Sequence, residues 1–187
     1  MNGNGANVAG CATCAGRCCR DYRVEVTVAD VRALAAGTAL HPSEFINLFE
    51  HDEAKRGFRL WPNGPFKQLH LIRRADTRAC TFLMEIALDK PRCGVYAHRP
   101  LVCRNFPAAL KRGTVAVRSG VTCGPNSWNL AAMDLPTYRR DLLRANAAWN
   151  EHWKIVAAWN TAIDATNIEK TPDELFAFLL SYTPEPS

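Results

Sequence analysis

The sequence lacks the apolar segments that would place the protein in or across a membrane. No run of apolar residues in the 187-residue chain approaches the roughly 18–20 that a membrane-spanning helix needs. Residues 1–10 have neither the cationic nor the apolar stretch of a secretion signal. We therefore expect a cytoplasmic protein with no membrane partner, in which residues 1–10 form a flexible N-terminus.

Nucleotide-binding loops, internal repeats and low-complexity tracts are also missing. There is no G-x-G-x-x-G or other phosphate loop, so no nucleotide cofactor is expected and no catalytic residue is assigned. The 23 Lys and Arg outweigh the 18 Asp and Glu and give a formal net charge of +5, with a pI near 8.9. This pI lies below the value above about 9 that is typical of nucleic-acid-binding domains. Nucleic acid is therefore not an expected partner, whereas another protein is a candidate partner.

What the chain does contain is cysteine. Four of its eight cysteines fall within nine residues, four more are spread over 44 residues farther along, and the C-terminal third has none. Disulfides are rare in a reducing cytosol, whereas zinc and iron–sulfur clusters bind cysteine thiolates. The composition therefore favours a metal site over an oxidised disulfide scaffold. The eight residues are Cys11, Cys14, Cys18, Cys19, Cys80, Cys93, Cys103 and Cys123.

The first four cysteines form a compact candidate metal-binding motif. Cys11 and Cys14 have the C-x2-C spacing at which a tight turn directs two sulfurs at one ion. Gly16 has no Cβ, so the chain can fold back closely and present Cys18 and Cys19. Adjacent cysteines point in different directions in most backbone conformations, so we expect one of this pair to join the first two and the other to serve a second site. Zinc and iron–sulfur clusters both take four thiolates, and the spacing does not separate them.

Further cysteine signatures follow in a recognisable order. They are Cys80-Thr81-Phe82-Leu83, Cys93-Gly94-Val95-Tyr96, Arg99-Pro100-Leu101-Val102-Cys103-Arg104-Asn105-Phe106-Pro107 and Cys123-Gly124-Pro125. With the N-terminal motif, they make residues 11–125 resemble the YkgJ-type cysteine-cluster family, a zinc- or iron-chelating domain. The resemblance implies metal chelation by all eight cysteines. One branch of that family, the flagellin lysine N-methylases, joins a similar cluster, read as a [4Fe-4S] site, to methyl transfer onto protein lysines, which implies redox or protein-modification chemistry.

Basic residues accompany the later signatures. Arg99 and Arg104 would bring positive charge beside the thiolates, lower the thiol pKa values and offset the negative charge of a four-thiolate site. His98 has the chemistry to replace a cysteine on zinc, but a solvated or core histidine is the preferred interpretation.

The remaining pattern within 11–125 predicts an irregular α+β fold. A helix is expected from Thr27, as its N-cap, to Gly37, just beyond its C-terminus. A second short helix is expected within 43–49, because Ser43 can cap it. Alternating segments predict a β-hairpin and a further strand. The hairpin strands are 57–61 and 68–73, with a turn at 63–65, and the further strand is 114–118.

Residues 126–187 form a different segment, rich in helix formers and holding four of the five tryptophans. Apolar residues at helical spacing from Tyr138 to Val156 predict a long amphipathic helix, and Pro172 opens a shorter one. The expected architecture is a small, irregular, metal-stapled cysteine-cluster domain over 11–125, of the α+β class, with a C-terminal helical extension, 126–187, that packs on it.

Two functions from different classes fit these patterns. In the first, the cysteines hold an iron–sulfur cluster, and the protein has redox or protein-modification activity, including methyl transfer. In the second, they hold structural zinc, and the protein is an interaction module without catalytic activity, in which the metal contributes folding free energy of about 10 kcal/mol.

Overall fold

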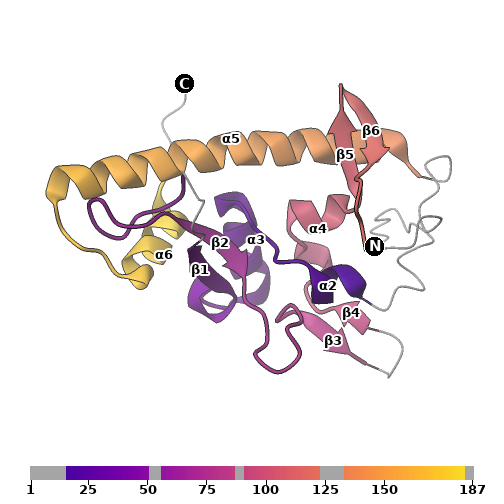
Figure 1. Cartoon of the computed structure of the whole chain (residues 1–187), viewed down its shortest axis with the longest axis horizontal. Helices are drawn as coiled ribbons and strands as arrows, with labels where there is room; N and C mark the ends of the chain where they lie inside the picture. The colour runs from indigo at the N-terminus through magenta and orange to yellow at the C-terminus, as the bar shows by residue number, and fades with distance from the viewer. Residues whose placement is uncertain (1–15, 51–55, 87–90, 123–132, 184–187) are drawn as a thin grey trace. The chain divides into compact units, whose positions relative to one another are not determined.

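A computed structural model describes residues 16–50, 56–86, 91–122 and 133–183 (Figure 1). The chain divides into two compact units. Unit 1 comprises Met1–Arg23 and Arg73–Ala145, and unit 2 comprises Val24–Ile72 and Asn146–Ser187. Each unit is therefore assembled from two separate stretches of chain. The boundaries predicted at residues 10 and 125, and the packing of 126–187 on the cysteine domain, stay predictions.

Unit 1 is built from short elements. β3 pairs with β4, and β5 pairs with β6, in two separate antiparallel sheets. A small apolar cluster joins the β5–β6 sheet to the start of α5, and its members are Ala108, Val115, Met133, Tyr138 and Leu142. The elements are α2 (Arg17–Asp21), β3 (Leu83–Glu85), β4 (Pro91–Cys93), the 3-10 helix η2 (Tyr96–His98), α4 (Leu101–Asn105), β5 (Ala108–Lys111), β6 (Thr114–Val117) and the first turns of α5 (Leu135–Thr166).

Unit 2 has a larger apolar core. Its elements are α3 (Val28–Thr38), the 3-10 helix η1 (Pro42–Glu44), β1 (Ile46–Glu50), β2 (Lys67–Leu71), the remainder of α5 and α6 (Pro172–Ser181). β1 and β2 are antiparallel, with Ile46 opposite Leu71. Full burial of one large apolar side chain stabilises a fold by about 1.5–3 kcal/mol. The largest fully buried side chains of unit 2 are Phe45, Phe58, Leu34, Leu69, Ile155, Ile163, Leu175, Leu179, Val26, Val28 and Val31.

Several sequence predictions are confirmed, including the α+β class. Thr27 caps α3 in a capping box: its hydroxyl accepts from the Asp30 N–H at 3.3 Å, and the Asp30 carboxylate accepts from the Thr27 N–H at 3.0 Å. The long and short C-terminal helices are α5 and α6, and the further strand is β6. The turn expected at 63–65 lies at 61–64, where the Gly64 N–H donates to the Trp61 carbonyl at 3.0 Å. Within the described residues, no helix has both the length and the apolarity needed to cross a membrane.

The second short helix expected within 43–49 is wrong. Only η1 is helical there, and the chain continues as strand β1. Ile46 and Phe49 are residues that favour a half-buried strand, and the backbone hydrogen bonds of this segment go to β2. A partner so far along the chain leaves no sign in the local pattern, so the short apolar run reads equally well as a helix.

The predicted hairpin is wrong in one of its strands. The second strand is present as β2, but its partner is β1, and 57–61 contributes only the bridge between Phe58 and Lys67. The reason lies on α5. The Asn160 amide donates to the Gly57 carbonyl at 2.8 Å and accepts from the Arg59 N–H at 2.9 Å. Side chains of a helix therefore take backbone hydrogen bonds that a neighbouring strand would otherwise provide.

The C-terminal end of α3 also differs from the prediction. Gly37 lies within the helix, which runs to Thr38, and Ala39 adopts the left-handed conformation with φ 58°. The Thr38 hydroxyl donates to the Leu34 carbonyl at 2.7 Å and accepts from the Leu40 N–H at 3.3 Å. With these hydrogen bonds, α3 continues past Gly37 and ends at Thr38, one residue after the glycine.

Candidate metal centre

All eight cysteines belong to unit 1, although they come from both of its stretches. Cys18 and Cys19 lie on α2, Cys80 follows the 73–79 segment, Cys93 ends β4, and Cys103 lies on α4. Three further predicted ligands lie outside the described residues, and they are Cys11, Cys14 and Cys123. Unit 2 contains no cysteine, so a thiolate centre must be formed by unit 1 alone.

Gly16 permits the close approach that the sequence suggested. It has φ +69° immediately before α2, a left-handed conformation that favours glycine. A Cβ at this position would lie 3.2 Å from the Pro91 side chain and 3.3 Å from that of Leu83. The glycine therefore brings the start of α2, with its two cysteines, directly against the β3–β4 sheet.

Two arginines fasten the Cys80 segment in place. The Arg73 guanidinium donates to the carbonyls of Arg20 and Arg78, and the Arg74 guanidinium donates to the carbonyls of Thr81, at 3.3 Å, and Leu83. Because each fork of N–H donors engages two backbone acceptors, it ties together segments that no regular sheet connects. The sequence pattern missed this role, since carbonyl acceptors leave no residue signature.

Backbone hydrogen bonds then bring Cys80 to its neighbours. Its N–H donates to the Cys19 carbonyl at 2.7 Å, and its own carbonyl accepts from the Leu83 N–H at 2.9 Å. Leu83 pairs across the β3–β4 sheet with Cys93. This series of backbone hydrogen bonds links α2, through Cys80 and Leu83, to Cys93.

The segment just before Cys123 is also attached to α2. The Thr122 N–H donates to the Tyr22 hydroxyl at 2.8 Å, and the Arg17 guanidinium donates to the Thr122 carbonyl at 3.2 Å. The last residue before the final cysteine therefore lies beside the helix that carries the first two described cysteines. Neither the tyrosine nor the arginine was selected from the sequence for this role.

Four of the described thiols lie close enough to influence one another electrostatically, and they form the set Cys18, Cys80, Cys93 and Cys103, called here the thiol tetrad. Burial raises the pKa of Cys103, and the other three thiols raise it further. Burial likewise raises the pKa of Cys80 and Cys93, with a contribution from Cys18 in each case. In the metal-free protein these thiols are therefore protonated at neutral pH, and a metal ion that binds them must displace their protons.

The two adjacent cysteines do not point apart as expected. Their Sγ atoms lie 3.9 Å from each other, because the two thiols share a hydrogen bond. This hydrogen bond, followed by burial, raises the pKa of Cys18. Cys19 therefore adjoins the tetrad through Cys18, and the adjacency in sequence does not separate the two sulfurs in space.

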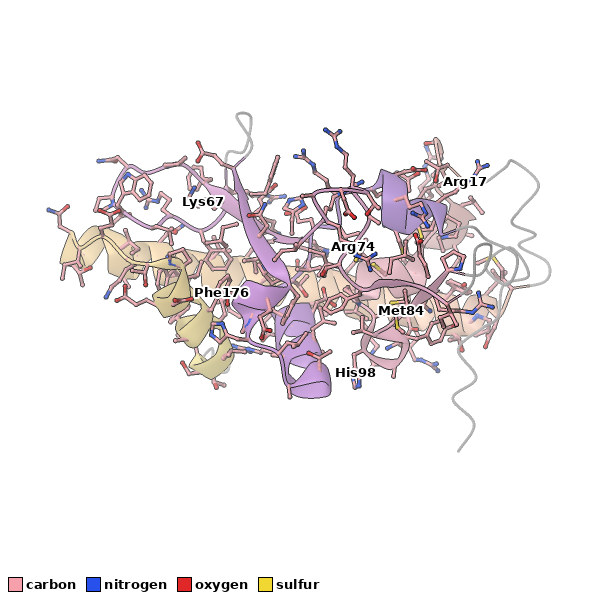
Figure 2. All side chains as sticks on the ribbon, turned by 90° about the horizontal axis from the view of Figure 1, so that it is seen from below. Arg17, Lys67, Arg74, Met84, His98 and Phe176 are labelled. Atoms are coloured by element: carbon pink, nitrogen blue, oxygen red, sulfur yellow. The ribbon has the colours of Figure 1, made fainter. Side chains whose placement is uncertain are left out.

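Positive charge accompanies the tetrad. The Arg99 guanidinium lowers the pKa of Cys18, Cys93 and Cys103 against the opposing effect of burial, and it stacks on the Tyr96 ring at 4.0 Å. The predicted role of Arg99 beside the thiols is thus confirmed. Arg74, labelled in Figure 2, acts in the same direction on Cys80.

Two other residues that the sequence placed near the thiols, Arg104 and His98, have side chains that pair with an acidic residue or are exposed to solvent. Arg104 forms an ion pair with Asp141, with N and O 3.8 Å apart, so its charge is directed at the start of α5. His98 is exposed (Figure 2), which agrees with a solvated histidine, one of the two preferred alternatives, and not with a core histidine. Arg99 is therefore the residue of this signature whose charge reaches the tetrad.

The donor set fits a thiolate-bound metal. Among the described residues, no three His, Cys, Asp or Glu side chains are already placed as ligands of one ion. The tetrad nevertheless offers four sulfur donors, the number that structural zinc and iron–sulfur clusters take. The guanidinium of Arg99 supplies charge that would offset part of the net −2 of four thiolates on a divalent ion.

Comparison with protein families agrees with the resemblance to the YkgJ type. Residues 10–124 match the family described as "CxxCxxCC: Putative zinc- or iron-chelating domain". No match to the chain was found among curated proteins or solved structures. The matched segment contains all eight cysteines and 115 of the 187 residues. The chain therefore belongs to the CxxCxxCC family of zinc- or iron-chelating domains.

Proposed function

We propose that unit 1 binds an iron–sulfur cluster or zinc through its eight cysteines, with the thiol tetrad at the heart of the site. The observation that carries the proposal is that backbone contacts join the segments of Cys19, Cys80 and Cys93. The thiols of the tetrad and the guanidinium of Arg99 also act on one another electrostatically. Buried thiols without a metal lose the solvation of their charged form and stay protonated, whereas a bound cation would stabilise the thiolates.

The ligands divide between the tetrad and a second group of four. The second group is Cys11, Cys14, Cys19 and Cys123. The C-x2-C spacing supports the first two members, and the contact of Cys19 with Cys18 supports the third. The attachment of Thr122 to α2 supports the fourth, because it holds the preceding residue close by. Two centres, or one polynuclear centre, would use all eight thiolates.

The two metals would supply different chemistry. An iron–sulfur cluster would supply one-electron transfer, whereas zinc would supply folding free energy and no redox chemistry. In both cases the residues of the chain do the same work: the tetrad holds the metal, Arg99 offsets negative charge, and the Arg73 and Arg74 contacts fix the Cys80 segment.

The experiment is metal and sulfide analysis of protein purified without oxygen, together with its visible absorption spectrum. A brown protein with iron and acid-labile sulfide identifies the cluster. A colourless protein with stoichiometric zinc identifies the structural metal. A protein that contains neither metal in stoichiometric amounts, and takes up neither on reconstitution, would contradict the proposal.

Single substitutions test the division of ligands. Cys93→Ser should remove the metal of the tetrad, and Cys14→Ser should remove that of the second group, so in a two-centre protein each variant loses about half of the metal. The control is Ala97→Ser, which adds a hydroxyl on the exposed surface of η2 and leaves every thiol in place. Unchanged metal content in Cys14→Ser would remove Cys14 from the ligand set.

A structural zinc module is the second candidate, and one observation favours it. Among the described residues, Leu83 is the one member of unit 1 in the set of twelve largest fully buried side chains. A unit that has few large, fully buried apolar side chains gains more stability from a metal that holds its segments together.

Redox or methyl-transfer activity on another protein belongs to the first candidate, through its resemblance to the lysine N-methylases. The test is incubation of the metal-loaded protein with a labelled methyl donor and candidate protein substrates. Label that appears on lysine and is lost with Cys93→Ser supports the activity, whereas reproducible absence of label with metal-replete protein counts against it.

A further inference from the structure

The charges of the chain are divided unequally between its two units. Unit 1 contains 16 Lys and Arg against 6 Asp and Glu, a formal net charge of +10. Unit 2 contains 7 against 12, a formal net charge of −5. The modest +5 of the whole chain is therefore the sum of a strongly basic unit and an acidic one. The expectation against nucleic acid rested on that whole-chain value.

The basic residues of unit 1 are of one kind. Fourteen of the sixteen are arginine and two are lysine. A guanidinium presents planar, paired N–H donors that match the oxygen atoms of a phosphate, and it is less strongly hydrated than an ammonium group. Arg73 and Arg74 use this geometry on backbone carbonyls within the unit. An exposed guanidinium such as that of Arg78 presents the same geometry to solvent, where it suits an anion with phosphate geometry.

Part of this charge gathers where α2 meets the 73–80 segment. The Arg73 guanidinium reaches the carbonyls of Arg20 and Arg78, and the Arg78 N–H donates to the Arg74 carbonyl at 2.9 Å. Arg17 begins α2, Arg23 follows the end of α2 by two residues, and both are exposed, as is Arg78 (Arg17 and Arg74 are labelled in Figure 2). We call this set, Arg17, Arg20, Arg23, Arg73, Arg74 and Arg78, the arginine cluster.

The acidic residues and the proposed metal site offset only part of the positive charge of unit 1. Asp21 and Asp76 lie within the same two segments, and Glu85 pairs with Arg20 at 2.5 Å. Two four-thiolate centres with divalent ions would add about −4 to the unit. Unit 1 would still carry about +6, so compensation of the thiolates explains less than half of its excess charge.

We propose that unit 1 binds nucleic acid through the arginine cluster, by contacts to the phosphate backbone that are independent of sequence. Such binding is dominated by the number of phosphates that basic side chains neutralise, because each contact releases condensed counterions. The proposal goes beyond metal chelation and does not require that either metal be identified.

Fluorescence anisotropy on the full, metal-replete chain tests the proposal. The probes are a single-stranded RNA and a double-stranded DNA of about 20 nucleotides or base pairs, and a polyglutamate peptide of similar charge. Binding of either nucleic acid should weaken as salt rises from about 50 to about 200 mM, with a log–log slope of about −0.7 per phosphate contact for a single strand and about −0.9 for a duplex. The peptide should bind more weakly.

A matched pair of variants locates the surface. Arg23→Gln/Arg78→Gln removes two exposed charges from the cluster, and Arg56→Gln/Lys154→Gln removes two exposed charges from unit 2. The first variant should reduce the slope for single-stranded RNA by about 1.4 and the affinity at low salt by about tenfold. The second should leave both unchanged. Metal content should equal that of the parent in both variants. A failure of the nucleic-acid proposal can therefore be told apart from a failure of metal chelation.

Three outcomes would overturn the proposal. They are the absence of binding to both nucleic acids at about 50 mM salt, equal losses in the two variants, and tighter binding of polyglutamate than of nucleic acid. The last outcome would assign the basic surface to an acidic protein instead.

Discussion

Unit 1 and unit 2 differ in cysteine content, in formal charge and in the number of large, fully buried side chains. Unit 1 contains all eight cysteines, carries a formal charge of +10, and contributes Leu83 alone to the twelve largest fully buried side chains among the described residues. Unit 2 has no cysteine, carries −5, and contributes the other eleven. From this difference we expect two sources of stability within one chain, the proposed metal coordination in the first unit and apolar burial in the second.

The side-chain contacts of the two units also differ. In unit 1, the guanidinium groups of Arg73 and Arg74 hold loop carbonyls together around the tetrad. In unit 2, His152 lies between aromatic rings, with centroids 4.7 Å from Trp153 and 5.6 Å from Phe58. Arginine donors thus hold the irregular backbone of unit 1 together, whereas unit 2 combines ring packing with a donor of the same kind, Arg32, which donates to the Leu179 carbonyl at 2.6 Å.

The largest expected effect comes from removal of the metal. Cys103→Ser, or a chelator, should abolish metal binding by the tetrad and unfold unit 1, because a structural four-thiolate site contributes about 10 kcal/mol to folding. Amide hydrogen exchange should then show loss of protection in β3, β4 and α4, with protection retained in α3 and α6. Val102→Ser, the neighbouring residue on α4, is the control for a new hydroxyl. Equal loss of protection in both units would show that they do not have separate sources of stability.

A core substitution in unit 2 should show the converse. Leu179 on α6 is fully buried, so Leu179→Ala should lower the free energy of unfolding by about 2–5 kcal/mol. Metal content should not change. The adjacent Leu180 is 43% exposed, and Leu180→Ala should stay within about 0.5 kcal/mol of the parent. Urea titrations followed by tryptophan fluorescence measure both, because four of the five tryptophans lie in unit 2.

The sequence predicted elements whose determinants are local. Thr27 and Asp30 are three residues apart and form the capping box that begins α3, and the spacing of apolar residues after Pro172 is enough to define α6. The cysteine signatures were also readable, because ligand type and spacing carry the chemistry. In each case the interacting residues lie within a few positions of one another.

Features that depend on distant partners were missed or misassigned. β1 was predicted as a helix because its pairing with β2 is set by residues about 20 positions away. The segment 57–61 is predicted as a strand, but Asn160 and Trp159, about 100 residues later, take the backbone hydrogen bonds of Gly57 and Arg59. The charge division was hidden for the same reason, since each unit combines two stretches that are not contiguous.

The next effect concerns pH and belongs to unit 2. Burial, with a smaller contribution from the charge of Arg56, lowers the pKa of His152 to about 4 from its ordinary value of 6.5. Between about pH 6.5 and pH 4 the unfolded chain therefore binds a proton that the folded chain excludes. The stability contributed by this histidine is complete above pH 6.5 and is lost as pH falls, by at most about 3 kcal/mol.

His152→Phe removes this titration, and the phenyl ring can keep the contacts that the imidazole makes with Trp149 and Trp153. The measurement is the difference in free energy of unfolding between pH 7 and pH 4.5, from urea titrations of parent and variant monitored by tryptophan fluorescence. We expect the parent to lose more stability than the variant over this range. The same loss in both proteins would show that groups other than His152 cause the acid sensitivity of unit 2.

The smallest effect compares two capping boxes in unit 2 that differ in burial. The box on α3 is buried, since Thr27 is 2% and Asp30 5% exposed. The box on α6, formed by Thr171 and Glu174, is exposed. Loss of an N-cap costs about 0.5–2 kcal/mol, and a buried donor left without its acceptor cannot turn to water. Thr27→Ala should therefore cost about 1–2 kcal/mol and Thr171→Ala about 0.5–1 kcal/mol in the same urea titration. If the two costs were equal, burial would not explain how strongly a cap stabilises this unit. A larger cost for Thr27→Ala would show that unit 2 depends on its interior even at the ends of its helices, as unit 1 is expected to depend on its metal.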